Sequence, residues 1–483
     1  MDLHFSDYFG VDRDVLHQYG AFDISIASDL PLFIDPFLIF NSQKPEYQSL
    51  HDGVLKYLVY LRDRAATTTD PGVIAGLYQF REVKQNWLGY TVLGNEGRGL
   101  GEAFGRALHG ALRGPMSGFG TESITASSHL EKLTLIKGGV GKDAISDFTT
   151  NLIKDYLCTY TETFAKAKLQ NLRRKEFAVE RAAFNYGTET WETRRYVLPH
   201  LKGDFVLLTP YDMLTRHDTW INHPDMLDRF PSVVAAVPDS QQRASINHYF
   251  RQHLLKNPTK KDRRSAARTT IDAFPDLIDY YIRAREESGH LAEGVSQKRV
   301  AETRQVFVDL LRDLLVALQS TAFYSRPLSS FEEALARAKF FKHYVEQKGG
   351  HRLINRQGKK PFSNENEVQI FFGLVFYGTE FDLSREPETG RGPVDFKVSK
   401  GLDKSLIEFK LGSNTQLKRN LENQIRTYEI AEKVATSVKV IVCYTAHEMR
   451  RVEKMLKELE LTDEEAVVVV DARTDNKPSA SKV

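Results

Sequence analysis

The stretch from Asn364 to Lys410 reads NENEVQIFFGLVFYGTEFDLSREPETGRGPVDFKVSKGLDKSLIEFK, and the spacing of its residues predicts the fold of the C-terminal part of the chain. A glycine-proline turn is expected to deliver Asp395 onto the start of a short strand. Apolar residues within 405–411 predict a second, buried strand. Because alternate residues of a strand share a face, Glu408 and Lys410 are expected to point the same way, toward Asp395 on the neighbouring strand.

Two carboxylates and a lysine in this arrangement are the groups that a metal-dependent nuclease needs. Oxygens of Asp395, Glu408 and the backbone carbonyl of Phe409 are expected to hold Mg²⁺ or Mn²⁺, because hard cations prefer oxygen ligands. Such a metal lowers the pKa of bound water and neutralises charge on the phosphate. Lys410 would orient the nucleophile or stabilise the phosphate. Taken alone, the pattern also describes an amphipathic strand with a solvated Glu and Lys.

The residues around this pattern support the nuclease interpretation. A helix is predicted to open at Glu365, and either Glu365 or Glu367 could assist the metal from it. Gln424 and Tyr428 lie one turn apart on a helix that follows the strand of Lys410. After the opening helix we expect a mixed sheet flanked by helices, built from strands 381–385, 395–398 and 405–411, helix 416–433, strand 438–444, helix 447–459 and strand 466–471.

In this combination the sequence resembles the PD-(D/E)XK nuclease superfamily, which has the restriction-endonuclease-like fold. The signature is Pro393-Val394-Asp395 followed by Glu408-Phe409-Lys410, and the Gln424 to Tyr428 spacing is similar to the QxxxY motif of RecB-type members. The resemblance covers residues 340–472. It implies that Asp395 and Glu408 ligate the metal and that Lys410 is the catalytic lysine. It also implies that Glu365 or Glu367 assists the metal, while Gln424 and Tyr428 position the site or the nucleic acid.

The resemblance implies a Mg²⁺-dependent deoxyribonuclease, with DNA favoured over RNA as the nucleic-acid partner. A free-standing nuclease with a large accessory region is similar to bacterial genome-defence enzymes of the restriction or abortive-infection kind, an analogy of architecture alone. A homo-oligomer or a partner protein from a defence system is compatible with that role. The alternative is a catalytically silent nucleic-acid-binding or assembly protein with the same fold.

Length and composition limit the class of protein. A chain of 483 residues suggests about three domains, and its apolar and charged fractions of 41% and 27% are typical of a soluble globular protein. The net charge is only +2, so affinity for nucleic acid must come from local patches. Cys158 and Cys443 are expected to be buried thiols. No long apolar run opens the chain, which predicts a cytoplasmic protein without a membrane partner.

The overall class predicted is α/β, in four parts. Residues 1–235 are expected to form an α/β region of unassigned fold, residues 236–328 a helical region, residues 329–472 the nuclease domain and residues 473–483 a disordered tail. Smaller expectations for the region before the nuclease domain are strands or a strand and a turn within 22–40, strands 194–198 and 204–208, a long helix capped by Ser146 or Asp147, and a linker at 289–293. Asp23 and Asp35 are predicted to be turn and capping acids, with a role as site residues as the alternative.

Three other patterns suggest alternative chemistry. The glycine-rich segment 97–105 lacks the context of a dinucleotide loop, and Lys137 to Lys142 lacks the Ser or Thr of a phosphate-binding loop. His217 and His223 flank Trp220, but a metal site needs a further ligand. A basic run at 166–175 is a solvated helix face by default, or a phosphate contact given the nuclease pattern downstream. A second basic cluster comprises Lys260, Lys261, Arg263, Arg264 and Arg268.

Overall fold

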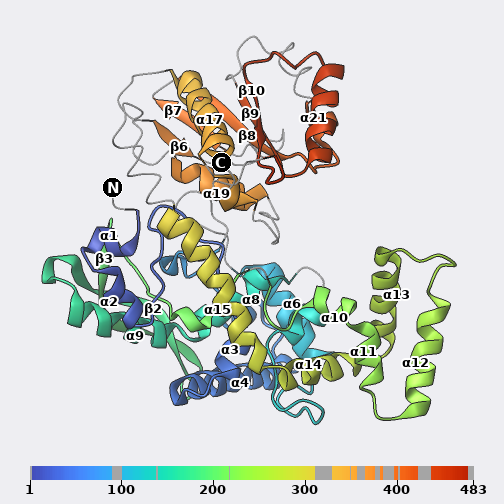
Figure 1. Cartoon of the computed structure of the whole chain (residues 1–483). Helices are drawn as coiled ribbons and strands as arrows, with labels where there is room; N and C mark the ends of the chain where they lie inside the picture. Colours follow the sequence, from blue (N-terminus) through green and yellow to red (C-terminus); the bar gives the residue numbers. More distant parts are fainter. Residues whose placement is uncertain are drawn as a thin grey trace.

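The computed structural model describes residues 3–89, 100–136, 140–216, 218–310, 329–348, 350–355, 365–375, 381–384, 396–400, 403–421 and 437–476. Figure 1 shows a larger body built from residues up to 310, with a sheet and its helices on one side of it. Among the described helices, none combines the length and apolar character needed to cross a membrane. Cys158 and Cys443 are both buried, as predicted.

The C-terminal part contains a five-stranded mixed sheet in the order β10-β9-β8-β7-β6. The antiparallel pairs are β6–β7 and β7–β8, and the parallel pairs are β8–β9 and β9–β10. The central strand is therefore β8, the strand that carries Glu408 and Lys410. The strands are β6 (Asp382–Ser384), β7 (Phe396–Lys400), β8 (Asp403–Leu411), β9 (Ser437–Cys443) and β10 (Val467–Asp471). The mixed sheet predicted for this part of the chain is confirmed.

Helices cover both faces of this sheet (Figure 1). On one face, the Phe409 ring of β8 lies 6.1 Å from Phe341 of α17 (Ser330–Gln347) and 4.6 Å from Phe372 of α19 (Glu365–Val375). On the other face, Ile441 of β9 joins a core cluster with Val452 of α21 (Ala446–Glu458) and with residues 417–421, which are helical. The short helix α18 (His351–Ile354) follows α17.

The region before residue 222 consists mainly of helices and one long hairpin. Strand β2 (Arg174–Asn185) pairs antiparallel with β3 (Thr190–Leu201), and β3 pairs with β4 (Asp204–Phe205). The short strands β1 (Phe33–Ile34) and β5 (Leu214–Thr215) also pair. The helices are α1 (Phe5–Phe9), α2 (Arg13–Gln18), α3 (Pro36–Asn41), α4 (Pro45–Ala65), α5 (Pro71–Tyr78), α6 (Glu102–Arg113), α7 (Lys132–Ile136), α8 (Lys142–Leu152) and α9 (Lys154–Lys168).

The acids predicted to cap or turn the chain near the N-terminus do so. Asp35 accepts a hydrogen bond from the backbone N–H of Phe37 and caps α3, which begins with Pro36 at its first position. Asp23 accepts from the backbone N–H and the hydroxyl of Ser6. Of the strands considered within 22–40, only the two residues of β1 form one. The proline after Asp35 favours a helix start at that point.

Three local predictions in this region are wrong. Gly141, and not Ser146 or Asp147, is the N-cap residue of α8, because the Ser146 hydroxyl instead accepts from the buried backbone N–H of Ile34. The expected long helix breaks at Ile153 into α8 and α9, and α9 ends at Lys168, before most of the basic run. The strand expected over 204–208 is limited to β4.

Asp147 is instead a buried acid inside α8, and its titration is predicted to control stability. Burial, reinforced by the negative charges of Asp143 and Glu82, raises the pKa of Asp147 from 3.8 to about 8. The folded protein therefore holds this proton from about pH 4 to pH 8 while the unfolded chain has lost it, so stability falls as pH rises through this window.

We expect Asp147→Asn to remove this particular pH dependence. We would measure the urea midpoints of the wild type and the variant from pH 5 to pH 9. The midpoint of the variant should exceed that of the wild type by an amount that grows up to about pH 8 and stays constant above it. Parallel midpoints over the whole range would show that Asp147 is ionised in the folded protein.

Residues 223–310 are helical and pack onto the first region. The helices are α10 (His223–Asp228), α11 (Phe230–Ala235), α12 (Ser240–Gln252), α13 (Lys260–Ala273), α14 (Leu277–Glu287) and α15 (His290–Arg304), followed by a π-helical turn, η4 (Gln305–Leu310). The linker predicted at 289–293 is wrong, since α15 begins at His290. Gly289 is needed there because a Cβ would collide with the Asn41 side chain, whose amide donates to the Gly289 carbonyl.

One cluster of buried residues spans the N-terminal region and the C-terminal sheet. A single cluster of buried residues contains Leu58 of α4, Phe307 of the π-helical turn and Phe409 of β8. Phe307 lies 6.5 Å from the Phe371 ring of α19, and its carbonyl oxygen is 3.0 Å from the buried ring nitrogen Nε2 of His4. The sheet is therefore held against the N-terminal region by apolar packing as well as by the chain connection.

Candidate functional site

The central strand β8 places Glu408 and Lys410 on one face of the sheet. Ile407 and Phe409 are buried beneath α17 and α19, whereas Glu408 and Lys410 alternate with them and are half-buried. Alternate strand residues point to opposite faces, so both charged side chains lie on the face opposite Phe409. The shared face predicted for Glu408 and Lys410 is confirmed.

The Lys410 ammonium is close to the backbone carbonyl that was predicted to bind metal. Its Nζ donates a hydrogen bond of 2.6 Å to the carbonyl oxygen of Phe409. This contact keeps a positive charge at the site.

A second lysine joins this face from the neighbouring strand. Lys439 of β9 is the register partner of Glu408, and parallel partners share a face of the sheet. Burial lowers the pKa of Lys439, while the nearby carboxylates of Glu408 and Glu464 oppose that shift. The Glu408 carboxylate and the Lys439 ammonium are therefore neighbouring opposite charges on this face.

Glu367 of α19 forms a buried ion pair with the N-terminal region. Its carboxylate lies 3.2 Å from Nη2 of Arg216, and the two side chains are 1% and 3% exposed. Burial raises the pKa of the Tyr444 hydroxyl, and the charge of Glu367 adds to the shift. Lys142 of α8 is close enough to Glu367 for the carboxylate to oppose the lowering of the lysine pKa by burial. Glu367 is thus within a cluster of charges contributed by both parts of the chain.

The remaining predicted site residues belong to other parts of the chain than the described ones. Asp395, Gln424 and Tyr428 lie outside the described residues, as does the side chain of Glu365, although helix α19 begins at Glu365 as predicted. Among the residues that the structure does describe, no three His, Cys, Asp or Glu side chains form a group that could hold a metal ion. The ligand set proposed from the sequence requires Asp395, which is not among them.

The described structure adds no support to the alternative sites predicted from the sequence. Residues 132–136, shortly before Lys142, form helix α7, whereas a phosphate-binding loop follows a strand. His223 is the first residue of α10, and His217 lies outside the described ranges, as do residues 97–99 of the glycine-rich segment. The basic run 166–175 crosses from the end of α9 into β2 and does not form one helix face.

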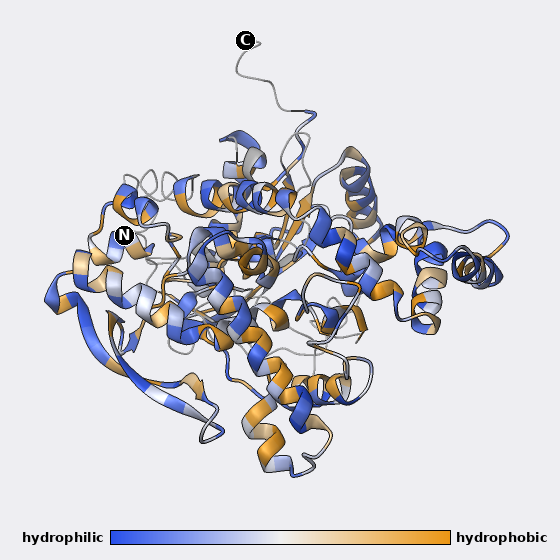
Figure 2. Ribbon diagram, turned by 90° about the horizontal axis from the view of Figure 1, so that it is seen from below, coloured by the Kyte–Doolittle hydropathy of each residue, from blue (hydrophilic) through white to orange (hydrophobic). Residues whose placement is uncertain are grey.

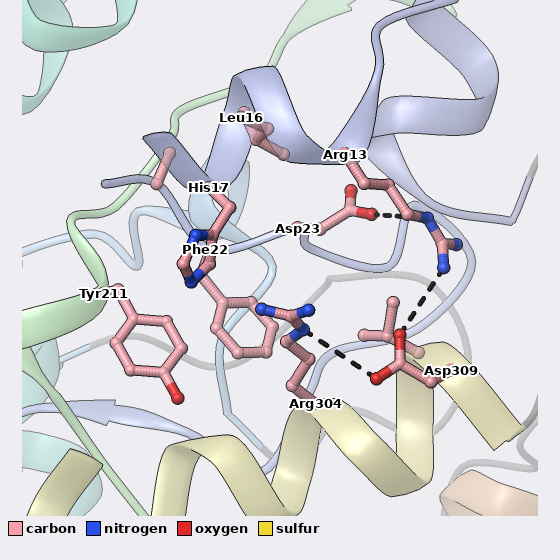
Figure 3. Close-up of a pocket in the computed structure, with 10 residues that line it drawn as sticks. Arg13, Leu16, His17, Phe22, Asp23, Tyr211, Arg304 and Asp309 are labelled. Atoms are coloured by element: carbon pink, nitrogen blue, oxygen red, sulfur yellow. Dashed lines mark ion pairs between the residues drawn. The ribbon is translucent and has the colours of Figure 1, made fainter. Parts of the chain in front are cut away.

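A polar pocket near the N-terminus is too small to be a substrate site. It lies between α2 and the end of α15, and Figure 3 shows Arg13 bridging Asp23 and Asp309, with Arg304 on the other side of Asp309. The ion-pair distances are 3.5 Å, 3.6 Å and 3.8 Å. The volume of the cavity is about 20 Å³, which is enough for a water molecule. Its charges therefore tie α2 to the π-helical turn.

Sequence reasoning missed two charged residues that lie next to predicted site residues, Lys439 beside Glu408 and Arg216 beside Glu367. Lys439 is the only charged residue in the otherwise apolar run of β9, so a signal for it was present. Arg216 carried no such signal, because it follows β5 in an irregular segment and meets Glu367 across 151 positions of sequence. Only the folded chain brings that pair together.

Two family models match separate segments of the chain. Residues 10–222 match a family described as "Domain of unknown function (DUF8370)", and residues 330–446 match one described as "Domain of unknown function (DUF8371)". No curated protein and no solved structure matches the chain. Arg216 lies in the first matched segment and Glu367 in the second, so their ion pair joins the two.

Proposed function

We propose that this chain is a metal-dependent nuclease of the PD-(D/E)XK type that hydrolyses phosphodiester bonds in DNA. The observation that carries the proposal is the position of Glu408 and Lys410, side by side on one face of the central strand of a five-stranded mixed sheet. A carboxylate and a lysine at this spacing supply an oxygen ligand for a cation and a positive charge beside it.

The residues present suit a hard divalent cation. Glu408 and the Phe409 carbonyl are oxygen donors on the same strand, and Asp395 precedes the first residue of β7, whose Phe396 pairs with Ile407 of β8. Mg²⁺ or Mn²⁺ bound by these donors would supply Lewis acidity and a water of lowered pKa. Lys410 has a flexible four-carbon stem, so its ammonium can turn from the Phe409 carbonyl toward a phosphate oxygen.

The two glutamates of α19 take different roles in this proposal. Glu367 already pairs with Arg216 in a buried environment, so we assign it to holding the N-terminal region against the site. Helix α19 packs on the Phe409 face of the sheet, opposite Glu408 and Lys410. A metal-assisting carboxylate from this helix, Glu365, would therefore have to reach the cation past the edge of the sheet. Gln424 and Tyr428 would position the site or the nucleic acid, as the family resemblance implies. We further propose genome defence as the biological setting, on the analogy of architecture alone.

A catalytically silent nucleic-acid-binding or assembly protein is the second candidate function. The observation in its favour is that two of the proposed site groups are already engaged within the protein, Lys410 with the Phe409 carbonyl and Glu367 with Arg216. Such a protein would bind nucleic acid without cutting it.

The test is nucleolysis by the purified protein on supercoiled plasmid, linear duplex, single-stranded DNA and RNA. We expect cleavage of DNA with Mg²⁺ or Mn²⁺, no cleavage in EDTA, and recovery on addition of excess Mg²⁺, because the bound cation activates the water and neutralises the phosphate. Cleavage that persists in EDTA would refute the metal site. Binding without cleavage on every substrate would support the silent protein.

A further inference from the structure

A strongly basic helical hairpin stands at the side of the molecule. It comprises α12, α13 and the connection between them, residues 240–273, and we refer to it as the basic arm. Figure 1 shows it beyond α10, α11 and α14, and Figure 2 shows hydrophilic residues along it. The basic arm carries eight Lys or Arg against two Asp, a net charge of +6, in a chain whose net charge is +2. Positive charge is therefore concentrated in one element.

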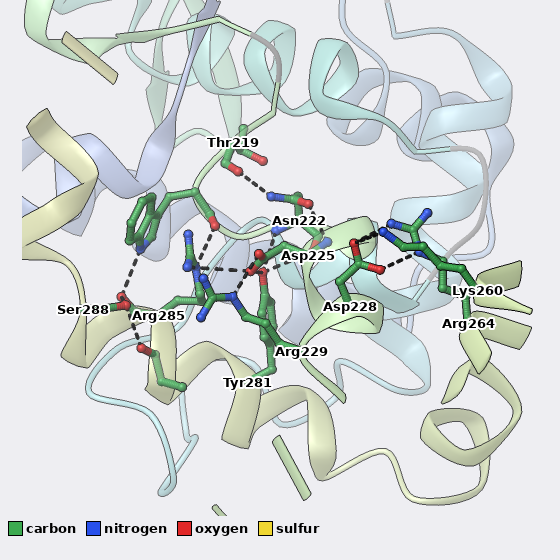
Figure 4. A network of polar contacts seen from close by, with 12 residues as sticks. Thr219, Asn222, Asp225, Asp228, Arg229, Lys260, Arg264, Tyr281, Arg285 and Ser288 are labelled. Carbon is green, nitrogen blue, oxygen red and sulfur yellow. Dashed lines mark hydrogen bonds and ion pairs between the residues drawn. The ribbon is translucent and has the colours of Figure 1, made fainter. Parts of the chain in front are cut away.

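The base of the basic arm is firmly attached to the body. Ile246 of α12 and Ile271 of α13 are buried in a core cluster with Phe230 of α11 and Tyr281 of α14. Figure 4 shows Asp228, at the end of α10, in contact with two cations of α13. The Arg264 guanidinium donates two hydrogen bonds of 2.6 Å to its carboxylate, and the Lys260 ammonium lies 3.1 Å from it. These contacts lower the pKa of Asp228 to about 2. They fix the rotation of α13 about its axis.

That orientation turns the other cations of the basic arm outward. Five of them are exposed and form no ion pair with any residue in the described ranges: Arg251, Lys256, Lys261, Arg263 and Arg268. One of the two acids, Asp262, is engaged in the capping box with Thr259 at the start of α13. The outer surface of the basic arm therefore presents positive charge that the described part of the protein does not neutralise.

The length and spacing of these charges fit a nucleic-acid backbone. Helices of 13 and 14 residues are about 20 Å long at a rise of 1.5 Å per residue. Duplex DNA carries about one negative charge per 1.7 Å of its axis, so the basic arm matches about six base pairs of phosphates. Lysine and arginine contacts of this kind are made to phosphate and carry no sequence information.

An anionic membrane is a poorer fit to the same surface. A helix that binds a membrane surface buries an apolar face opposite its cations. In the described part of the basic arm, the only large hydrophobic side chain that is exposed is Leu255, at the connection between the helices. The apolar faces of α12 and α13 are occupied by the core cluster with α11 and α14.

We propose that the basic arm binds the phosphate backbone of duplex DNA, apart from the sheet that carries Glu408 and Lys410. The choice of DNA as the polyanion rests on the proposed nuclease function. The interaction is independent of base sequence and of metal. It would hold a long substrate against the protein while cleavage takes place elsewhere.

The test is the salt dependence of DNA binding with and without three of these cations. We would measure the dissociation constant for a 30-base-pair duplex in EDTA, from 50 to 200 mM salt, for the wild type and for Lys261→Gln/Arg263→Gln/Arg268→Gln. Each phosphate contact contributes about 0.9 to the magnitude of the slope of the logarithm of the association constant against the logarithm of the salt concentration. We therefore expect the variant to reduce this slope by about 2 to 3. We also expect its affinity for DNA at 100 mM salt to be lower by about tenfold or more.

A control with the same change in charge isolates the basic arm. Arg113→Gln/Lys202→Gln/Lys298→Gln removes three exposed cations from other elements, each without an ion pair in the described residues. It should leave the slope within about one unit of the wild type. Equal losses in both variants, or no loss in the first, would overturn the proposal. If the first variant loses helical signal, the single change Lys261→Gln should still lower the slope by about one.

Two further outcomes separate this proposal from the nuclease itself. Binding is measured in EDTA and does not depend on cleavage. If the wild type cleaves no substrate but the arm variant still shows the smaller salt dependence of DNA binding, the basic arm is supported and the nuclease is refuted. Wild-type binding to vesicles of anionic phospholipid with no binding to DNA would overturn the assignment to nucleic acid.

Discussion

Lys410→Met is expected to lower the rate of metal-dependent DNA cleavage about 10²- to 10³-fold, with the fold unchanged. Methionine keeps most of the length of the side chain and removes the positive charge beside the Glu408 face. Loss of one charge-stabilising group from an active site costs roughly this factor in turnover. Because the Lys410 side chain is half-buried and lies away from the Phe409 core, the melting temperature should change little. Single-turnover cleavage of a linear duplex, with protein in excess, measures the effect.

Lys404→Met is the matched control for this prediction. Lys404 lies on the same strand and, by alternation, on the same face as Lys410, but it is exposed and pairs with Ser399 at the far end of the β7–β8 hairpin. We expect the cleavage rate of this variant to be within about threefold of the wild-type rate, because surface changes away from a site have small effects. Equal rates for Lys410→Met and the wild type would show that Lys410 has no part in the reaction.

Arg216→Met is expected to destabilise the protein by about 3–5 kcal/mol. The change leaves the Glu367 carboxylate, which is 1% exposed, without the Arg216 cation, and removing one partner of a buried ion pair costs about this much. Since the pair joins the N-terminal region to α19, the apolar contact between Phe307 and Phe371 should loosen with it. Urea unfolding followed by circular dichroism gives the free energy of unfolding.

The double variant Arg216→Met/Glu367→Gln separates a lost charge pair from lost packing. Removing both charges avoids leaving the buried Glu367 carboxylate without its Arg216 partner, so the double variant should recover at least half of the loss. Arg106→Met, which breaks an exposed pair with Glu102 in α6, should cost less than about 1 kcal/mol. A loss for Arg216→Met no larger than for Arg106→Met would contradict a stabilising role for the buried pair.

The C-terminal sheet could be predicted from sequence because its signals are local. Strands β8 and β9 are rich in apolar residues, as in Val438 to Val442, and helix α21 follows β9. Strand alternation then gave the common face of Glu408 and Lys410 without knowledge of what packs on either side. The same reasoning could not place Asp395, Gln424 or Tyr428 relative to them, and the described residues do not include these three.

Elsewhere the local signals were overridden by long-range contacts. Ser146 is a good helix cap by residue type, but its hydroxyl accepts from Ile34, 112 positions away, and sits inside α8. Strand β2 was missed because five of its twelve residues, Arg174 to Asn185, are charged and most of them are at least partly exposed, so no apolar run marks it. Pairing with β3 and packing against α9 hold it in place, and neither is visible in its own sequence.

The most direct test of the nuclease proposal is the cleavage of supercoiled plasmid in Mg²⁺ by the wild type and by Glu408→Gln, compared at equal concentration. Glutamine keeps the shape of the side chain and removes the charge that a cation would bind, so the proposal predicts rapid nicking by the wild type and a loss of about 10²-fold or more in the variant. The free energies of unfolding of the two proteins, measured with urea, should agree to within about 1 kcal/mol. Equal cleavage by the two proteins would contradict the assignment of Glu408 to the metal site and, with it, the proposed mechanism.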